Sequence, residues 1–192
     1  MLNHNGTVKI ETERLILRLI DDEDIHDFYE FAKLPDVAHL AGWRPHVNEK
    51  ETKIVIRMSR DKIRFGQLGN FAIILKETGK MIGTIELHSY TKDYKAELGF
   101  CLNPKYWNQG YITEAAKAVV VWGFDEVHLK RIEAHTFLDN LSSQKVLEKI
   151  NFTFEGIKKK GYQAHDGKIY DVKAYGITDD DFYNLVRKNG IK

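Results

Sequence analysis

One short segment of the chain has the residue types that can bind an anion through backbone atoms. Residues 107–112 (WNQGYI) contain a central glycine, Gly110, and the residues from Thr113 onward read as an apolar helix. The first N–H groups of a helix have no partner within it and carry partial positive charge. Because glycine lets the backbone approach closely, the segment predicts a site for a phosphate or pyrophosphate group. The alternative is a plain strand-to-helix connection in which Gly110 only makes a turn.

The hydrophobic pattern predicts a mixed α/β fold whose elements position this segment. Alternation predicts the strands, helical periodicity predicts the helices, and the acidic run 21–24 caps the first helix. The predicted strands are 7–20, 71–75, 81–87, 96–102, 131–137, 152–157 and 168–177. The predicted helices are 22–34, 48–65, 113–127, 142–150 and 179–188, with a loop over 38–48. No linker divides this order, so we expect one domain over residues 1–192.

Composition and missing motifs exclude several classes of protein. The 192 residues carry 29 basic and 28 acidic side chains, a net charge of +1, which gives no reason to expect nucleic acid or an anionic membrane as partner. A polar start and a single cysteine, Cys101, favour a cytoplasmic protein without a disulfide. Neither a Walker-type phosphate loop nor a dinucleotide-binding G-x-G-x-x-G segment is present.

The loop resembles a known family. Residues 107–115 (WNQGYITEA) are similar to the pyrophosphate loop of the GNAT acetyltransferase superfamily, which in its RimJ/RimL-like N-acetyltransferases commonly reads W-G-x-G-Y-A-T-E-A. Five positions match, namely Gly110, Tyr111, Thr113, Glu114 and Ala115. Asn108 and Ile112 stand where small residues are usual. We expect the branched side chain of Ile112 to crowd the phosphate approach and to alter affinity rather than abolish it.

Two further segments resemble the same family. Residues 140–152 (NLSSQKVLEKINF) are similar to its segment N-x-x-S-x-x-V-L-E-K-L-G-F. Asn151 replaces the usual glycine, and asparagine is the next-best residue for a left-handed helix C-cap. Residues 12–18 (TERLILR) resemble the opening of the RimJ/RimL-like branch. The resemblance extends over about residues 10–178.

The resemblance implies a fold, a reaction and a co-substrate. The fold would be a mixed, mostly antiparallel sheet of six to seven strands, flanked by helices and splayed between 96–102 and 131–137. The chain would move an acetyl group from acetyl-CoA to an amine by direct attack in a ternary complex, without a metal. A backbone N–H near Phe100 or Cys101 would stabilise the oxyanion. The residues implied to contact acetyl-CoA are Phe100, Cys101, Leu102, Trp107, Asn108, Gln109, Gly110, Tyr111, Ile112, Thr113, Asn140 and Ser143.

The residues that would move protons are less well defined. Leu147 stands where many family members have a tyrosine acid, so Ser143, or else Ser142, is the candidate acid; an ordinary first-turn helix serine is the alternative. Glu97 and Glu86 are the candidate bases, and each could instead be a solvated charge on the sheet. His88 is, by its residue type, the most suitable proton-transfer group at neutral pH, although it could lie beyond its strand. Nothing near Cys101 in sequence would activate a thiolate, which disfavours a covalent route.

The sequence does not identify the acceptor amine. Trp43, Arg44 and His46 in the predicted loop are candidates to line its site. A protein N-terminus is favoured, as in the ribosomal-protein N-acetyltransferases. The alternatives are a small-molecule amine (an amino sugar, polyamine or antibiotic) or a CoA-binding module without catalysis. The protein would be a monomer or a homodimer.

Overall fold

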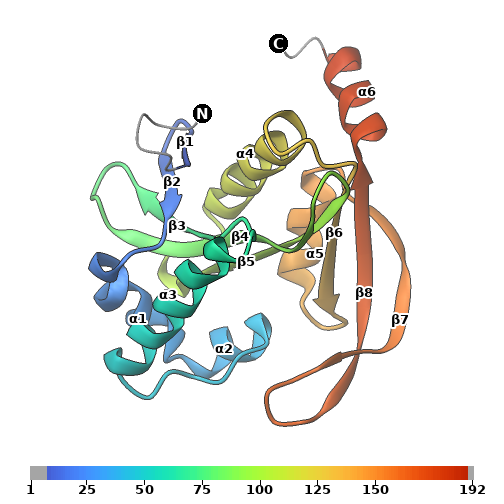
Figure 1. Cartoon of the computed structure of the whole chain (residues 1–192). Coiled ribbons are helices and arrows are strands. Elements are labelled where there is room, and N and C mark those ends of the chain that lie inside the picture. Colours follow the sequence, from blue (N-terminus) through green and yellow to red (C-terminus); the bar gives the residue numbers. More distant parts are fainter. Residues whose placement is uncertain (1–7, 190–192) are drawn as a thin grey trace.

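The computed structural model describes residues 8–189 and contains one sheet of eight strands in the order β1-β2-β3-β4-β5-β6-β8-β7 (Figure 1). All neighbouring strands are antiparallel except β5 and β6, which are parallel. The strands are β1 Lys9–Glu11, β2 Leu15–Leu19, β3 Asn70–Leu75, β4 Met81–Thr91, β5 Lys95–Leu102, β6 Arg131–Phe137, β7 Thr153–Gln163 and β8 Ile169–Thr178.

The helices lie on both faces of the sheet. They are α1 Ile25–Ala32, α2 Pro35–Ala41, α3 Glu49–Arg64, α4 Tyr111–Asp125, α5 Leu141–Lys149 and α6 Asp179–Asn189, with the 3-10 turns η1 Asp22–Asp24 and η2 Pro104–Tyr106. One buried cluster packs α4 and α5 against the sheet, and a second packs α1, α2 and α3 against it. None of the helices between residues 8 and 189 is long and apolar enough to cross a membrane.

The sheet opens between its two central strands. β5 and β6 pair only where Lys95–Glu97 lie beside Arg131–Glu133, and beyond these residues the two strands diverge. From residue 98 onward, the backbone groups of β5 that point toward β6 have no strand partner. The expected splay between these two strands is therefore present, and Glu97 lies at its fork.

The predicted fold class is confirmed, with differences in the elements. The single strand predicted over 7–20 is two antiparallel strands, and its first residue lies outside the described ones. The turn between them is closed by Thr12, whose hydroxyl accepts a hydrogen bond from the Leu15 N–H at 3.0 Å. Alternating hydrophobicity does not reveal such a turn, so the sheet has eight strands instead of six to seven.

The ends of several helices and strands also differ from the sequence prediction. Pro35 is the first residue of α2, which continues to Ala41 into the predicted loop, because proline suits a first helical turn. α4 begins at Tyr111 rather than Thr113. β4 continues to Thr91, so His88 lies within the strand. Asn151 has a φ of 66°, which confirms the left-handed residue predicted after α5.

Candidate active site

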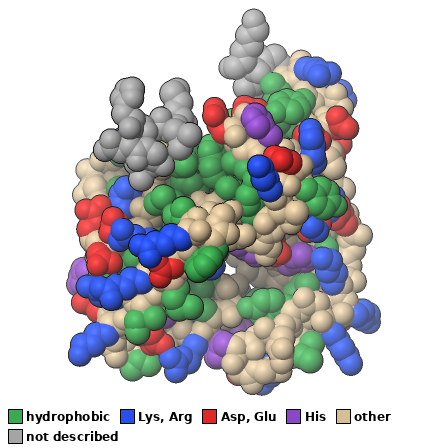
Figure 2. All heavy atoms as spheres, viewed as in Figure 1, with side chains coloured by type: hydrophobic (Ala, Val, Ile, Leu, Met, Phe, Trp, Pro, Cys, Tyr) green, Lys and Arg blue, Asp and Glu red, His purple; other side chains and the backbone are tan. Residues whose placement is uncertain are grey.

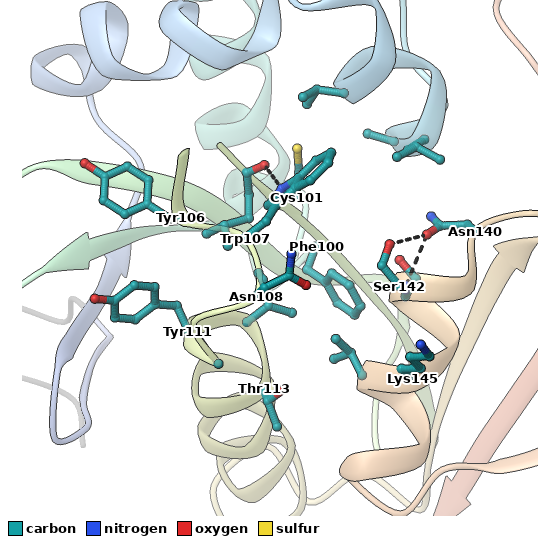
Figure 3. Close-up of a pocket in the computed structure, with 18 of the residues that line it drawn as sticks. Phe100, Cys101, Tyr106, Trp107, Asn108, Tyr111, Thr113, Asn140, Ser142 and Lys145 are labelled. Carbon is teal, nitrogen blue, oxygen red and sulfur yellow. Dashed lines mark hydrogen bonds between the residues drawn. The ribbon is translucent and has the colours of Figure 1, made fainter. Parts of the chain in front are cut away.

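A cavity of about 370 Å³ lies between the end of β5, the start of α4 and one side of α5 (Figure 3). It extends to α2 and includes Lys145 and Lys149 on α5. Every residue predicted to contact acetyl-CoA lines it, except Gln109. These lining residues are Phe100, Cys101, Leu102, Trp107, Asn108, Gly110, Tyr111, Ile112, Thr113, Asn140 and Ser143.

The loop before α4 has an unusual backbone. Asn108 has a φ of 59° and Gly110 a φ of 82°, so both are left-handed. Asparagine tolerates this region better than other residues with a side chain, which explains how it replaces a small residue here. Gly110 is the N-cap of α4, and no side chain between residues 8 and 189 caps the helix. The N–H groups of its first turn therefore face the cavity without a side-chain acceptor, as an anion site requires.

A clasp of Arg14 and Glu114 holds this loop against the N-terminal strands. The Arg14 Nε donates to Glu114 Oε2 at 2.6 Å, and its Nη1 donates to the Gln109 carbonyl at 3.0 Å. The guanidinium also lies 4.4 Å from the ring centre of Tyr111. Glu114 Oε1 accepts from the Thr12 hydroxyl at 2.6 Å. Thr12 and Arg14, from the segment that resembles the family's opening, thus hold the loop and the start of α4 in place.

Three loop residues occupy positions that the sequence did not indicate. Ile112 is 8 % exposed and packs in the core around α4, while it also lines the first cavity. Gln109 contributes its carbonyl to Arg14, and its side-chain amide donates to the Lys105 carbonyl at 3.1 Å. Trp107 donates from Nε1 to the Leu102 carbonyl at 2.8 Å (Figure 3), which ties the loop to the end of β5.

A second cavity of about 490 Å³ adjoins the first on the open side of the sheet. The two share a boundary formed by Leu40, Ala41, Phe100, Asn140 and Ser143. Figure 2 shows this face of the molecule hollowed near its centre, with histidine side chains beside the hollow. A molecule in the second cavity would therefore lie next to a molecule bound in the first.

Glu97 has the closest charged neighbours of the two acids that line the second cavity. Its Oε1 lies 2.7 Å from His135 Nδ1 on β6 and 3.9 Å from His88 Nε2 on β4. Lys158 Nζ on β7 lies 2.6 Å from the other ring nitrogen of His135. Burial raises the pKa of Glu97, but the hydrogen bond from His135 and the nearby positive charges outweigh it, so the pKa lies below its ordinary value. Glu97 is therefore ionised at neutral pH.

The other predicted catalytic residues have different surroundings. Glu86 lines the same cavity, and Lys62 Nζ lies 3.9 Å from its Oε2. Asn140 caps α5 by accepting from the Ser143 N–H at 3.1 Å, and the Ser142 hydroxyl donates to the same oxygen at 3.0 Å (Figure 3). Among residues 8–189 the Ser143 hydroxyl makes no such bond, and Ser143 lines both cavities.

The thiol of Cys101 is buried at the edge of the first cavity. Burial raises its pKa to about 12. The side chain is thus a neutral thiol at pH 7, in keeping with the prediction that it is not a nucleophile.

The expected acceptor residues of the predicted loop do not line either cavity. Trp43 packs edge-on against Phe28 and beside His46. His46 is buried and hydrogen-bonds the Thr52 hydroxyl, while Arg44 pairs with Glu51. They lie outside both cavities because α2 continues to Ala41, so residues 40–42 reach the second cavity and the following ones turn away.

Sequence reasoning missed several residues that line the cavities. His135 shares a face of β6 with Glu133, an alternation visible in the sequence, yet its approach to Glu97 depends on the register of β5 and β6. Tyr162 comes from the β7–β8 hairpin and donates to the Gly42 carbonyl at 2.8 Å, which bridges the second cavity. No local pattern indicated this contact between residues 120 positions apart.

Comparison with known proteins agrees with this geometry. Residues 14–153 match the family described as the acetyltransferase (GNAT) domain. The uncharacterized N-acetyltransferase p20 of Bacillus licheniformis is 30% identical over 86% of this chain and 93% of its own length. A GNAT-family acetyltransferase of Bacillus anthracis has a TM-score of 0.80 at 30% identity, over 90% of this chain and 99% of that one.

A third similar structure is described as the ribosomal-protein-S5-alanine acetyltransferase of Vibrio fischeri. It has a TM-score of 0.75 at 25% identity, over 91% of this chain and 98% of that one. The chain with the open sheet and the uncapped α4 described above belongs to the GNAT family of N-acetyltransferases. Enzymes of this family take their acetyl group from acetyl-CoA.

Proposed function

We propose that this protein transfers the acetyl group of acetyl-CoA, bound in the first cavity, to an amine that enters through the second. The observation that carries the proposal is the junction of the two cavities at Phe100, Asn140 and Ser143, beside the fork of β5 and β6. A thioester and an amine could meet there without either crossing the other's site. The ionised Glu97 lies on the acceptor side of this junction.

The residues of the first cavity fit a CoA molecule. The uncapped start of α4 supplies N–H donors for the pyrophosphate, and Lys145 and Lys149 add positive charge on the facing helix. The backbone of Phe100 to Leu102, which has no strand partner toward β6, can pair with the amides of the pantetheine arm. We assign Asn140 a second role, as a donor to that arm through its side-chain amide, beside its capping role as an acceptor.

The proposed reaction is a direct attack. The acceptor nitrogen bonds to the acetyl carbonyl carbon while Glu97 takes the proton that this nitrogen loses. The C–S bond then breaks, and the Ser143 hydroxyl donates its proton to the departing thiolate while it takes up a proton from solvent water. An N–H of Phe100 or Cys101 would stabilise the oxyanion in between. Glu86, which lines the same cavity, is the second candidate base.

A protein N-terminal amine is the acceptor that we favour. An α-amine has a pKa of about 8, against about 10.4 for lysine, so a low-pKa carboxylate such as Glu97 suffices as its proton acceptor. Within the second cavity both acids have basic neighbours, which gives little excess negative charge to attract polyamines. The similarity to the Vibrio fischeri ribosomal-protein acetyltransferase supports the same class.

An acceptor screen tests this proposal. Purified protein is incubated with acetyl-CoA and either peptides with free N-termini, the same peptides with blocked N-termini and a free lysine, polyamines, or aminoglycosides, and thiol release is followed. We expect turnover with the free N-termini. Turnover with small amines alone would assign the small-molecule alternative. Tight acetyl-CoA binding with no acceptor in any class would favour the non-catalytic module.

A further inference from the structure

The chain of contacts behind Glu97 crosses three strands that are far apart in sequence. Glu97 is on β5, His135 on β6 and Lys158 on β7, and their side chains contact in that order at 2.7 Å and 2.6 Å. His135 Nδ1 faces the carboxylate, and its Nε2 faces the lysine ammonium. An imidazole between an anion and a cation can satisfy both neighbours in only one tautomer.

The chemistry of the three groups decides which tautomer it is. A lysine ammonium has donors and no acceptor, so the His135 Nε2 beside it must carry the lone pair. The ring proton then resides on Nδ1, which donates to Glu97 Oε1. Lys158 thereby keeps the ring proton of His135 on Nδ1. The hydrogen bond from this Nδ1–H holds Oε1 of Glu97 in place. The second oxygen, Oε2, remains for the acceptor amine.

We propose that His135 and Lys158 are positioning residues for Glu97, which orient its carboxylate and keep it ionised for the acceptor amine. The inference rests on the proposed role of Glu97 as the proton acceptor. Neither residue contacts the reacting atoms, so neither is catalytic in its own right. Their effect is exerted through the direction and charge of the Glu97 carboxylate.

Other charged groups also face this carboxylate. From β4, His88 Nε2 lies 3.9 Å from Glu97 Oε1, and Glu86 lies beside it with Lys62 of α3. From β6, Glu133 is occupied by Lys95 and Arg131. From β7, Tyr162 lines the cavity, and the charge of Glu97, together with burial, raises the pKa of Tyr162. His88 is thus the nearest further group to the Glu97 carboxylate after His135.

The charge of Lys158 can be removed without disturbing the core, because the side chain is exposed on the edge strand β7. Lys158→Met removes the donor, and Lys158→Arg keeps it. Lys159→Met is the matched control, since Lys159 is the next exposed residue of the same strand and does not line the cavity. His135→Asn keeps a donor at the place of Nδ1, whereas His135→Leu removes it.

The first readout does not need an acceptor. In ¹⁵N spectra of histidine-labelled protein at pH 7.5, with the His135 signals identified by their loss in His135→Asn, we expect the proton on Nδ1 and none on Nε2. In Lys158→Met, His135 should carry a proton on Nε2, either in place of the one on Nδ1 or in addition to it. The His135 signals of Lys158→Arg and Lys159→Met should match those of the wild type. An Nε2 proton already present in the wild type would overturn the inference.

The second readout is the pH dependence of kcat/KM for the best acceptor. Lys158 is one of the groups that hold the pKa of Glu97 down, so Lys158→Met should move the titration of Glu97, which lies below about pH 4.5 in the wild type, to higher pH. At pH 7.5, where Glu97 stays ionised, we expect the lost orientation of its carboxylate to lower kcat/KM for the acceptor by about tenfold, a part of the roughly 10²–10⁴-fold that a positioned base contributes, with KM for acetyl-CoA unchanged. His135→Leu should lose more than His135→Asn.

The outcomes separate this inference from the proposed function. A wild-type protein that acetylates no acceptor would reject the proposed function, while the ¹⁵N experiment would still report on the tautomer. An active wild type whose pH profile is the same in Lys158→Met and Lys159→Met would reject the positioning role alone. Full activity of His135→Leu would reject it as well.

Discussion

Arg14 Nε donates to Glu114 Oε2 at 2.6 Å, across 100 residues of sequence. Through this bond and the one to the Gln109 carbonyl, Arg14 holds the first turn of α4 and the end of the loop that precedes it. Loop N–H groups bind an anion well only when their directions are fixed beforehand, because ordering them on binding costs entropy. The contact therefore links the N-terminal strands to the affinity of the proposed CoA site.

The first prediction removes this clasp. Arg14→Gln should raise KM for acetyl-CoA roughly tenfold, or about 1.4 kcal/mol, with a smaller change in kcat. Arg57→Gln, an exposed arginine on α3, serves as the control and should behave as wild type. The double variant Arg14→Gln with Glu114→Gln should cost less than the sum of the two single changes, since both break one contact. Strict additivity would contradict the clasp.

The second prediction tests the loop as the pyrophosphate site. Gly110→Glu places a negative side chain on a left-handed residue beside the α4 N-terminus and should abolish acetyl-CoA binding in calorimetry. Gly79→Glu is the control, because Gly79 has a φ of 71° and open space around it, away from the cavity. Comparable thermal stability of the two variants excludes misfolding. Unchanged affinity in Gly110→Glu would reject the site.

The third prediction concerns the proton for the leaving thiolate. Ser143→Ala should lower kcat by about tenfold or more while KM for acetyl-CoA changes little, since the capping bond uses the backbone N–H of Ser143. Ser142→Ala removes the hydroxyl that donates to Asn140, so it should lower the stability of α5 instead. Steady-state kinetics at saturating acceptor distinguishes the two. Full turnover in Ser143→Ala would exclude it as the acid.

The fourth prediction concerns the base. Because the pKa of Glu97 is below its ordinary value, Glu97 is already ionised above about pH 4.5, and a rise in rate near pH 8 reports the acceptor amine. Glu97→Gln should lower kcat/KM for the acceptor by roughly 10²–10⁴-fold and leave that rise in place. Glu86→Gln should have a much smaller effect. A larger loss of kcat/KM in Glu86→Gln than in Glu97→Gln would assign the role of the base to Glu86.

The fifth prediction concerns stability in acid. Hydrogen bonds from Lys105 and Lys80 lower the pKa of Glu30 to about 2. Its contribution to stability is therefore present above about pH 4.5 and is lost as the pH falls through about 2. Glu30→Gln should lower Tm at pH 7 by about 2–4 °C, since a partly exposed ion pair is worth up to ~1 kcal/mol.

The control for this prediction is Glu13→Gln, which changes an exposed acid that makes no ion pair among the described residues. The Tm difference between wild type and Glu30→Gln should shrink as the pH is lowered from 4.5 to 2. A difference that stays constant over this range would assign the effect to packing rather than to charge.

Several features of the site were predictable because they depend on neighbours along the chain. A glycine before an apolar helix predicts a free helix N-terminus, and Gly110 is that N-cap. The asparagine after α5 predicts a left-handed residue, and Asn151 has this conformation. The strand β6 has the bounds 131–137 that its alternation predicts. These features follow from local conformational preferences, which the sequence alone determines.

The contacts across the sheet were decided by the tertiary structure. Glu97 meets His135, 38 residues away, only because β5 and β6 pair in one register before they diverge. Trp43 and His46 pack beside each other because α2, a helix that the sequence pattern did not indicate, continues to Ala41. Side-chain periodicity gives the face of a strand but not its partner, so pairings between distant elements, and with them the surroundings of the base, required the folded chain.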